Sequence, residues 1–226
     1  MRKIITFLFL AILGYYMVNL MNQIPFGEDR MNVGRYYLEN TVSETGSVNT
    51  VTSIVVSYRG FDTLGEVTVL FLAATGLGAI LFDKRGKKRR KQHASSLVRT
   101  TSKLLYPLIV LLGAYVFVHG HLTPGGGFQG GAIIATGVLM MYMSYRKFET
   151  NHKALTIIES VAGLTFITLG MTGLILGQTF LENFLPLGTP NTLLSAGIIP
   201  IIYSAVGFKV GAELTGVLDT LLKTIR

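Results

Sequence analysis

The chain has 226 residues, of which 50% are hydrophobic and only 14% charged, and its mean hydropathy is +0.51. Soluble domains carry about 25% charged residues, so this composition excludes an ordinary soluble protein and indicates an integral membrane protein. Because the sequence has no cysteine, it also excludes disulfides, thiolate metal sites and thiol catalysis. The net charge of +8 does not indicate nucleic-acid binding, because the basic residues lie in loops between apolar stretches.

Six stretches are apolar and long enough to cross a membrane, which takes about 20 residues as a helix. They are 3–21, 62–82, 103–120, 127–145, 155–177 and 192–215. The first follows Arg2 and Lys3, as in a signal peptide, but no small-residue cleavage site follows it, so we expect a retained helix. Pro107 and Pro200 interrupt the third and the sixth stretch. The sequence therefore predicts an all-α integral membrane protein with about six transmembrane helices.

Two segments between the first two spans do not cross the membrane. Residues 22–50 are polar and mildly acidic and are predicted as a long loop. Residues 48–58 are apolar on one face only and too short to span, which favours a short interfacial or re-entrant helix. Their Val, Ile and Thr content leaves a β-strand as the alternative.

The positive charges predict the orientation in the membrane. A basic loop, 83–102, has the composition of a nuclear-localisation or nucleic-acid patch, but between two spans the positive-inside rule explains it better. With this loop inside, most of the 20 Lys and Arg residues fall on the cytoplasmic side, and both termini are cytoplasmic. The loop divides the chain into a two-span unit, 1–82, a cytoplasmic linker, 83–102, and a four-span unit, 103–226.

Ionisable residues within membrane spans are costly and need a partner or a function. Asp62 and Glu66 lie four residues apart on one face at the outer end of the second span, and Arg59 is placed to pair with Asp62. Two carboxylates at a membrane mouth suit proton or Na⁺ handling. The alternative is a structural ion pair that caps the helix N-terminus.

The last span holds a second pair at the same spacing, Lys209 and Glu213. Pairing avoids two isolated charges in the membrane, and the pair suits either a proton relay step or a packing contact that fixes the helix orientation. Glu159 lies about one turn into the fifth span, near the cytoplasm, where its side chain is long enough to reach the membrane surface. The candidates for an ion path are therefore Asp62, Glu66, Lys209, Glu213 and Glu159.

A glycine-rich turn joins the third and fourth spans. It reads His119-Gly120-His121-Leu122-Thr123-Pro124-Gly125-Gly126-Gly127-Phe128-Gln129-Gly130-Gly131. Glycine permits sharp turns and close helix approach, so the sequence predicts a tight helical hairpin. We assign hairpin and packing roles to Pro124, Gly125, Gly126, Gly127, Gly130 and Gly131.

Four histidines remain to be assigned. His119 and His121, at the mouth of the hairpin, are candidates, with Arg59, for ion pairing or gating; solvated side chains without a role are the alternative. His93 and His152 lie in predicted cytoplasmic loops and receive no role. The sequence has no phosphate-binding loop, no H-E-x-x-H zinc motif and no Cys cluster, so we expect no catalytic residue, metal or cofactor in this chain.

The glycine-rich turn, with Leu105-Tyr106-Pro107 before it, resembles the MnhB (MrpB) subunit of multisubunit Mrp-type Na⁺/H⁺ antiporters. The family's run R-G-H-x-x-P-G-G-G-F-x-G-G is nearly complete, with His119 where Arg is commoner. The stretch Gly207-Phe208-Lys209-Val210-Gly211-Ala212-Glu213 resembles the last helix of the same family. The likeness covers about 97–220. Residues 48–66 resemble instead the C-terminal part of the large MrpA subunit, which also occurs as a small separate subunit of membrane-bound hydrogenases.

These resemblances imply a multi-pass cell-membrane subunit of an Mrp-type module, with Na⁺ and H⁺ as the transported ions. The implied partners are the other membrane subunits of the module, the lipid bilayer and hydrogenase or ferredoxin-linked oxidoreductase subunits, and no nucleic acid. Three alternatives stay open: a non-catalytic packing scaffold of such a complex, a subunit of a dedicated antiporter without a redox partner, and a standalone channel.

Overall fold

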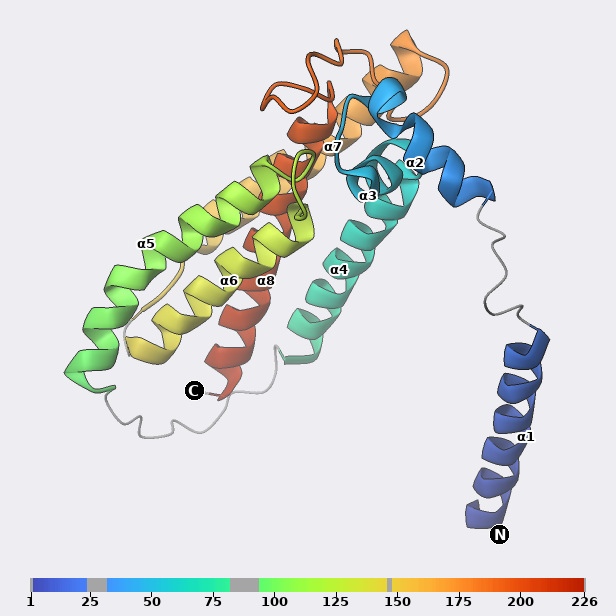
Figure 1. Ribbon diagram of the computed structural model, residues 1–226. Helices are drawn as coiled ribbons and strands as arrows, with labels where there is room; N and C mark the ends of the chain where they lie inside the picture. Colours follow the sequence, from blue (N-terminus) through green and yellow to red (C-terminus); the bar gives the residue numbers. More distant parts are fainter. Residues whose placement is uncertain (1, 24–31, 82–93, 146–147, 226) are drawn as a thin grey trace. The chain divides into compact units, whose positions relative to one another are not determined.

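The computed structural model describes residues 2–23, 32–81, 94–145 and 148–225, and the regular structure in these ranges is entirely helical (Figure 1). The chain divides into two compact units, residues 1–36 and 37–226. The first unit holds α1 (Arg2–Gln23), which is strongly apolar, and the start of α2 (Asn32–Thr45).

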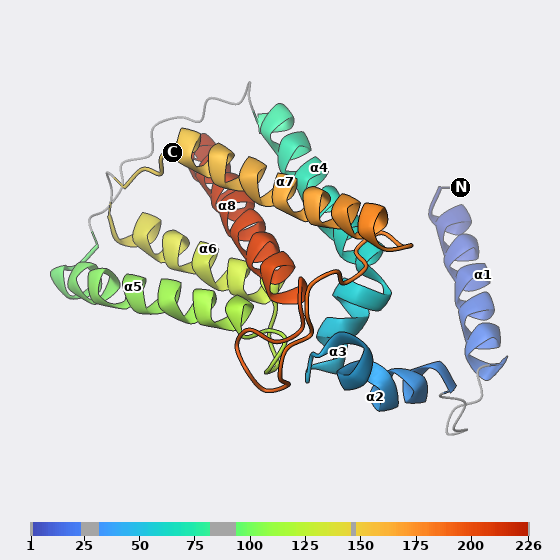
Figure 2. The ribbon, with the colours of Figure 1, turned by 90° about the horizontal axis from the view of Figure 1, so that it is seen from above.

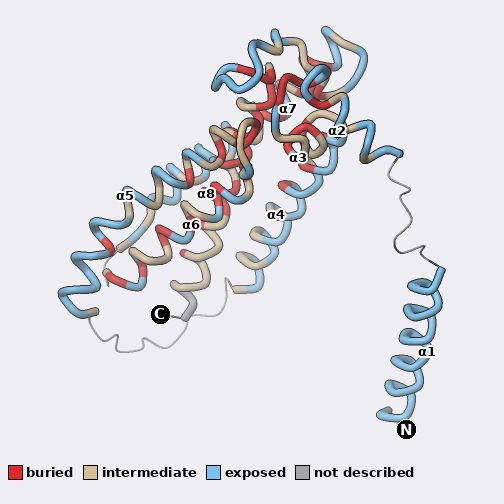
Figure 3. Tube along the Cα trace, in the orientation of Figure 1, coloured by how far each residue is buried: buried red, intermediate tan, exposed pale blue. Residues whose placement is uncertain are grey.

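The second unit is built around its last helix, α8. This helix packs against all four other long helices of the unit, and 56% of its span is buried. The helices are α4 (Gly60–Leu81), α5 (Ser96–Val118), α6 (Gly127–Ser144), α7 (His152–Leu176) and α8 (Ile199–Ile225). In both ribbon views α6 lies beside α5 on one side and α8 on the other (Figures 1 and 2). Buried positions gather on α6, on α8 and in the loops at one end of the unit (Figure 3).

Five of the described helices are long and apolar enough to cross a membrane: α1, α4, α5, α7 and α8. The predicted fourth span corresponds to α6, which has 18 residues and packs between α5 and α8. The chain is a multi-pass protein of the cell membrane. The number of six spans and the cytoplasmic position of both termini remain predictions.

The segment between the first two spans is more helical than predicted. Within the predicted loop 22–50, residues Asn32–Thr45 form α2. The short helix expected at 48–58 is confirmed as α3 (Thr50–Ser53), which continues as the π-helical turn η1 (Ile54–Tyr58). Asn49 begins this helix, because its side chain accepts a hydrogen bond from the backbone N–H of Thr52. The β-strand alternative is therefore wrong.

The last span begins later than predicted, at Ile199 rather than at residue 192. The preceding Ala196 and Gly197 have φ values of 66° and 56°, in the left-handed region that interrupts a right-handed helix. Pro200 consequently lies in the first turn of α8 and does not interrupt the span, contrary to the prediction. A proline is tolerated there because the first-turn N–H groups have no partner within the helix. Pro107, by contrast, does lie inside α5.

Glycines allow α6 to lie very close to both of its neighbours. A Cβ atom added to Gly130 would stand 2.5 Å from the backbone oxygen of Gly113 in α5. A Cβ atom added to Gly131 would stand 2.8 Å from the backbone oxygen of Gly207 in α8. Small residues at such crossings allow helices to gain van der Waals contact in lipid, where the hydrophobic effect no longer drives them together.

The glycine-rich turn and the segment that begins α3 lie together at one end of the second unit. The side chain of Asn49 donates hydrogen bonds to the backbone oxygens of Gly120 (2.8 Å) and Thr123 (2.9 Å). The backbone oxygen of His121 accepts from the N–H of Val48 at 3.1 Å. The glycine-rich turn is thus fastened to the segment that begins α3.

Candidate functional site

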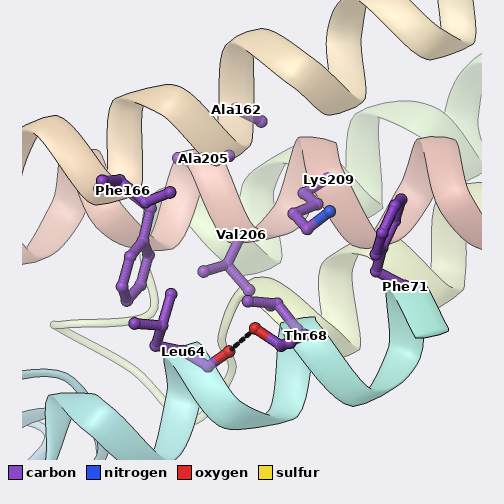
Figure 4. A pocket seen from close by; sticks show the side chains of 11 residues that line it. Leu64, Thr68, Phe71, Ala162, Phe166, Ala205, Val206 and Lys209 are labelled. Carbon is purple, nitrogen blue, oxygen red and sulfur yellow. Dashed lines mark hydrogen bonds between the residues drawn. The ribbon is translucent and has the colours of Figure 1, made fainter.

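A groove runs along α8 between α4 and α7, which both pack against α8. One part of it, an apolar cavity of 180 Å³, is lined by α4, α7 and α8, with Leu64, Phe71, Phe166 and Val206 among its walls (Figure 4). The other part, which we call the polar groove, has a volume of 210 Å³ and contains carboxylate, imidazole and hydroxyl groups. Phe71 lines both parts, so the two spaces adjoin.

Lys209 stands where the apolar cavity and the polar groove meet. Its Nζ lies 3.5 Å from Oε1 of Glu159 and 3.6 Å from Oε2 of Glu213, and 5.2 Å from the ring centroid of Phe71. The Glu213 side chain is only 2% exposed, and among the described residues neither of its carboxyl oxygens has a hydrogen-bond partner. We call Lys209, Glu159 and Glu213 the charged triad.

Local sequence sets the position of each triad residue along its own helix. Lys209 and Glu213 share one face of α8 because they are four residues apart. Asn151 caps α7 by accepting a hydrogen bond from the N–H of Ala154 (3.3 Å), and this sets the start of the helix. Glu159 follows two helical turns later and meets Lys209 across the groove. From the sequence, the Glu159 side chain could also reach the membrane surface. In the structure it lines the polar groove.

The triad has one positive and two negative charges when all three groups are ionised. Attraction between charges is strong where water is scarce, and isolated charges in a membrane are costly. Since the two nitrogen–oxygen distances are nearly equal, the ammonium can pair with either carboxylate. A proton or a cation that neutralises one carboxylate would shift the ammonium toward the other. The arrangement therefore suits reversible binding of H⁺ or Na⁺.

A second polar cluster, which we call the Asp219 cluster, lies toward the predicted cytoplasmic end. Asp219 is fully buried and accepts a hydrogen bond from the hydroxyl of Tyr142 at 2.5 Å. Its other carboxyl oxygen pairs with Nε2 of His152, whose side chain is 56% exposed. The Tyr142 hydroxyl also lies 3.0 Å from that of Thr150.

The Asp219 cluster was not predicted from the sequence. The predicted last span ends at residue 215 and His152 has no predicted role, whereas α8 continues to Ile225. The available signal was Asp219 itself, a single carboxylate within the apolar run 217–222.

Asp62 and Glu66 are not part of either cluster. Arg59 pairs with Asp62 at 2.7 Å, as the spacing predicts, and both side chains are at least half exposed. Glu66 is exposed as well. Neither carboxylate lines the apolar cavity or the polar groove. Their role in an ion path remains a prediction.

The two histidines of the glycine-rich turn differ in environment. His119 is half-buried and stacks on Tyr115, with ring centroids 4.2 Å apart. His121 is fully buried, and its Nε2 lies 3.4 Å from the backbone oxygen of Thr192. Burial lowers the pKa of His121 below its ordinary value because desolvation disfavours the imidazolium, and the nearby His119 adds to the effect. His121 is therefore placed to favour the neutral form.

The predicted hairpin residues occupy the turn and the crossing of α6 with its neighbours. Pro124 is exposed in the turn. A Cβ atom on Gly125 would stand 2.8 Å from the backbone oxygen of Val116, and one on Gly126 would stand 2.8 Å from Oε1 of Gln129. Three further members, Gly127, Gly130 and Gly131, are buried on α6. The structure thus separates these packing positions from the charged triad.

Comparisons with known proteins cover both halves of the chain. Residues 97–216 match the family described as a domain related to the MnhB subunit of Na⁺/H⁺ antiporter. Residues 1–96 match the MbhE family, a subunit of MBH. An uncharacterized protein of Methanocaldococcus jannaschii is 30% identical over 194 residues, which cover 74% of each chain.

Two solved structures resemble the whole chain. A chain of the membrane-bound sulfane sulfur reductase, an archaeal respiratory membrane complex, is 44% identical with a TM-score of 0.85, and the match covers 98% of both chains. A chain of the Mrp complex from Dietzia sp. DQ12-45-1b is 26% identical with a TM-score of 0.79, and the match covers 97% of this chain but 26% of that one. The chain belongs to the family of domains related to the MnhB subunit of Na⁺/H⁺ antiporters.

Proposed function

We propose that this chain is a membrane subunit of an Mrp-type Na⁺/H⁺ antiporter module within a redox-driven complex. The full-length likeness to a chain of a respiratory membrane complex and the match to the MbhE family support the redox link. The MnhB match and the likeness to an Mrp complex support the antiporter module. Its partners are then the other membrane subunits of the module and hydrogenase or oxidoreductase subunits.

The charged triad carries the proposal for what this subunit does. Lys209 lies within 3.6 Å of two carboxylates, one of them almost fully buried, next to a groove that holds further polar groups. We assign the exchange of H⁺ and Na⁺ to the charged triad. When H⁺ or Na⁺ neutralises Glu213 or Glu159, the Lys209 ammonium moves to the other carboxylate, and release of that ion reverses the movement. The chain needs no cofactor and no catalytic centre of its own for this role.

Antiport by the assembled complex tests the role of the triad. Inverted membrane vesicles carrying Glu213→Gln should lose Na⁺-dependent proton release by at least about tenfold, because the amide keeps the shape but cannot take up a proton. Glu149→Gln, which neutralises an exposed carboxylate outside the groove, is the matched control and should behave as wild type. Full antiport by an assembled Glu213→Gln complex would refute the assignment. The same assay on Glu66→Gln tests the predicted outer carboxylate.

A packing scaffold without ion movement is the second candidate function. The observation that favours it is the close approach of α6 to α5 and α8 at Gly130 and Gly131. If neutral substitutions at all three triad positions left coupled activity intact, the scaffold would be the better account.

Composition of the native complex identifies the partners. Mass spectrometry of every co-purifying chain, with iron and nickel assays, distinguishes a dedicated antiporter from a redox-driven complex. Antiporter-like subunits without these metals would indicate a dedicated antiporter, and the same subunits with iron would indicate a redox-driven ion pump. A chain that purified alone and folded would contradict the assignment as a subunit.

A further inference from the structure

The groove between α4 and α7 is open to the surroundings of the subunit. Both helices pack against α8 but have hardly any contact with each other. Side chains on both edges of the groove are exposed, among them Thr68, Phe71 and Thr75 on α4 and Thr156 on α7. Since α4, α7 and α8 are all long and apolar enough to cross a membrane, this opening lies within the bilayer.

The charged triad lies at the floor of this opening. The side chains of Lys209 and Glu159 are 13% and 24% exposed, so both are accessible from the groove. Glu159 follows His152, the first residue of α7, by seven residues, which is about 10 Å along the axis at ~1.5 Å per residue. The charges are therefore held inside the span and not at its end, where water would neutralise them.

This chain does not balance the charge of the triad. One ammonium and two carboxylates leave one negative charge in excess when all three groups are ionised. Glu213 lines the polar groove and is 2% exposed, yet within the described part of the chain no hydrogen bond reaches either of its carboxyl oxygens. His152, the other ionisable side chain in the groove, is paired with Asp219. Ionisable groups inside a membrane almost always have a partner, and lipid tails offer neither a charge nor a donor.

The walls of the groove allow another helix to approach closely. Ala74 and Gly216 line the polar groove, and Ala162, Gly163 and Ala205 line the apolar cavity. A Cβ atom added to Gly163 or Gly216 would meet nothing within 4 Å, so the space in front of both is open. Small residues favour helix contact in lipid because they let the backbones come close.

We propose that a transmembrane helix of another subunit occupies the groove between α4 and α7 and places a Lys or Arg side chain against Glu159 and Glu213. This fourth charge balances the triad whenever neither H⁺ nor Na⁺ is bound there. The two solved structures that resemble this chain belong to membrane complexes, in which neighbouring subunits supply such helices. The inference goes beyond the proposed function, since the excess charge needs a partner whether or not ions move.

Site-specific photo-cross-linking in the assembled complex tests the inference. Thr75 and Thr156, on opposite walls of the polar groove, are replaced one at a time by p-benzoylphenylalanine, and native membranes are illuminated. Mass spectrometry of the adducts should show that both positions capture the same membrane helix of one other subunit, and that this helix carries Lys or Arg. The same probe at Leu111, which is exposed on α5 and lies outside the groove, is the matched control and should not capture that helix.

Reversing the charge tests the electrostatic part of the inference. Glu159→Lys changes the excess charge of the triad from negative to positive, so the cross-link from position 75 should fall at least about tenfold because like charges repel. Replacing the captured Lys or Arg by Glu in the same complex should restore it. Glu149→Lys, which reverses an exposed carboxylate outside the groove, should leave the yield unchanged.

Several results would overturn the inference. They are adducts with lipid alone, with this same chain or with a helix that lacks Lys and Arg, and a yield that Glu159→Lys does not change. If Glu159→Lys fails to assemble, Glu159→Gln decides, because it removes the excess charge and keeps the shape; an unchanged yield would then contradict the charge pairing. These readouts do not involve antiport, so full antiport by Glu213→Gln would refute the proposed function without affecting the docked helix.

Discussion

Replacing Gly131 by alanine should force α6 away from α8. The new Cβ atom would stand 2.8 Å from the backbone oxygen of Gly207, the backbone nitrogen of Gly211 and Cβ of Val210. Ordinary contact begins at 3.4 Å, so the helices must separate by about 0.6 Å, and two of the three obstructing atoms are backbone atoms that cannot rotate away. The strain therefore has to be relieved by movement of a whole helix.

Overpacking of this kind costs about 1–3 kcal/mol, and the better helix propensity of alanine returns up to about 1 kcal/mol. With the full return subtracted, the expected net loss is up to about 2 kcal/mol, which lowers the melting temperature of a domain of this size by up to about 8 °C. The measurement is the temperature at which half of the chain aggregates when native membranes that contain the complex are heated.

Gly76→Ala in α4 is the matched control, because a Cβ atom there meets nothing within 4 Å. It should melt at or slightly above the wild-type temperature, since it gains helix propensity without strain. If Gly131→Ala and Gly76→Ala melted together, close packing between α6 and α8 would not explain the glycine at 131.

Three further predictions concern the end of the molecule that holds the glycine-rich turn. Burial lowers the pKa of His121 below 6.5, so below that pH the unfolded chain binds more protons than the folded chain. The free energy of unfolding should therefore be highest above pH 6.5 and should fall as the pH drops below it. Melting curves should show a smaller decline for His121→Gln, and an equal one would contradict this account. Asn49→Ala removes two hydrogen bonds and a helix cap, so it should destabilise the attachment of the glycine-rich turn by about 1–3 kcal/mol. The turn should then be cleaved faster by a protease. An unchanged cleavage rate would refute the importance of the Asn49 contacts. Breaking the exposed Arg59–Asp62 pair with Asp62→Asn should change stability by less than about 1 kcal/mol in the same melting assay, and a larger loss would show that the pair is structural.

Patterns within one helix were predictable from the sequence, and contacts between helices were not. The spacing of Lys209 and Glu213 places them on one face of a helix whatever surrounds it. Contact between Lys209 and Glu159 depends on how α7 and α8 rotate against each other, and no local pattern encodes that rotation. The pairing of His152 with Asp219 escaped prediction for the same reason, since the two residues are 67 positions apart. The late start of α8 depended on left-handed backbone at Ala196, a residue type that gives no such signal.

The opposite faces of α8 connect packing with the proposed ion chemistry. Gly207 and Gly211 meet α6, and Lys209 and Glu213, each two residues further on, point into the groove between α4 and α7. At about 100° per residue, a step of two residues turns the helix by roughly 200°, so the two sets must face opposite ways. The close glycine contact fixes the rotation of α8 about its axis, and that rotation sets the position of the ammonium between its carboxylates. Gly131→Ala should therefore reduce Na⁺/H⁺ exchange beyond what its loss of assembled complex explains, because shifting α8 alters the two distances that hold Lys209. A rate per assembled complex equal to wild type would show that the triad tolerates this shift and that packing and ion exchange are independent.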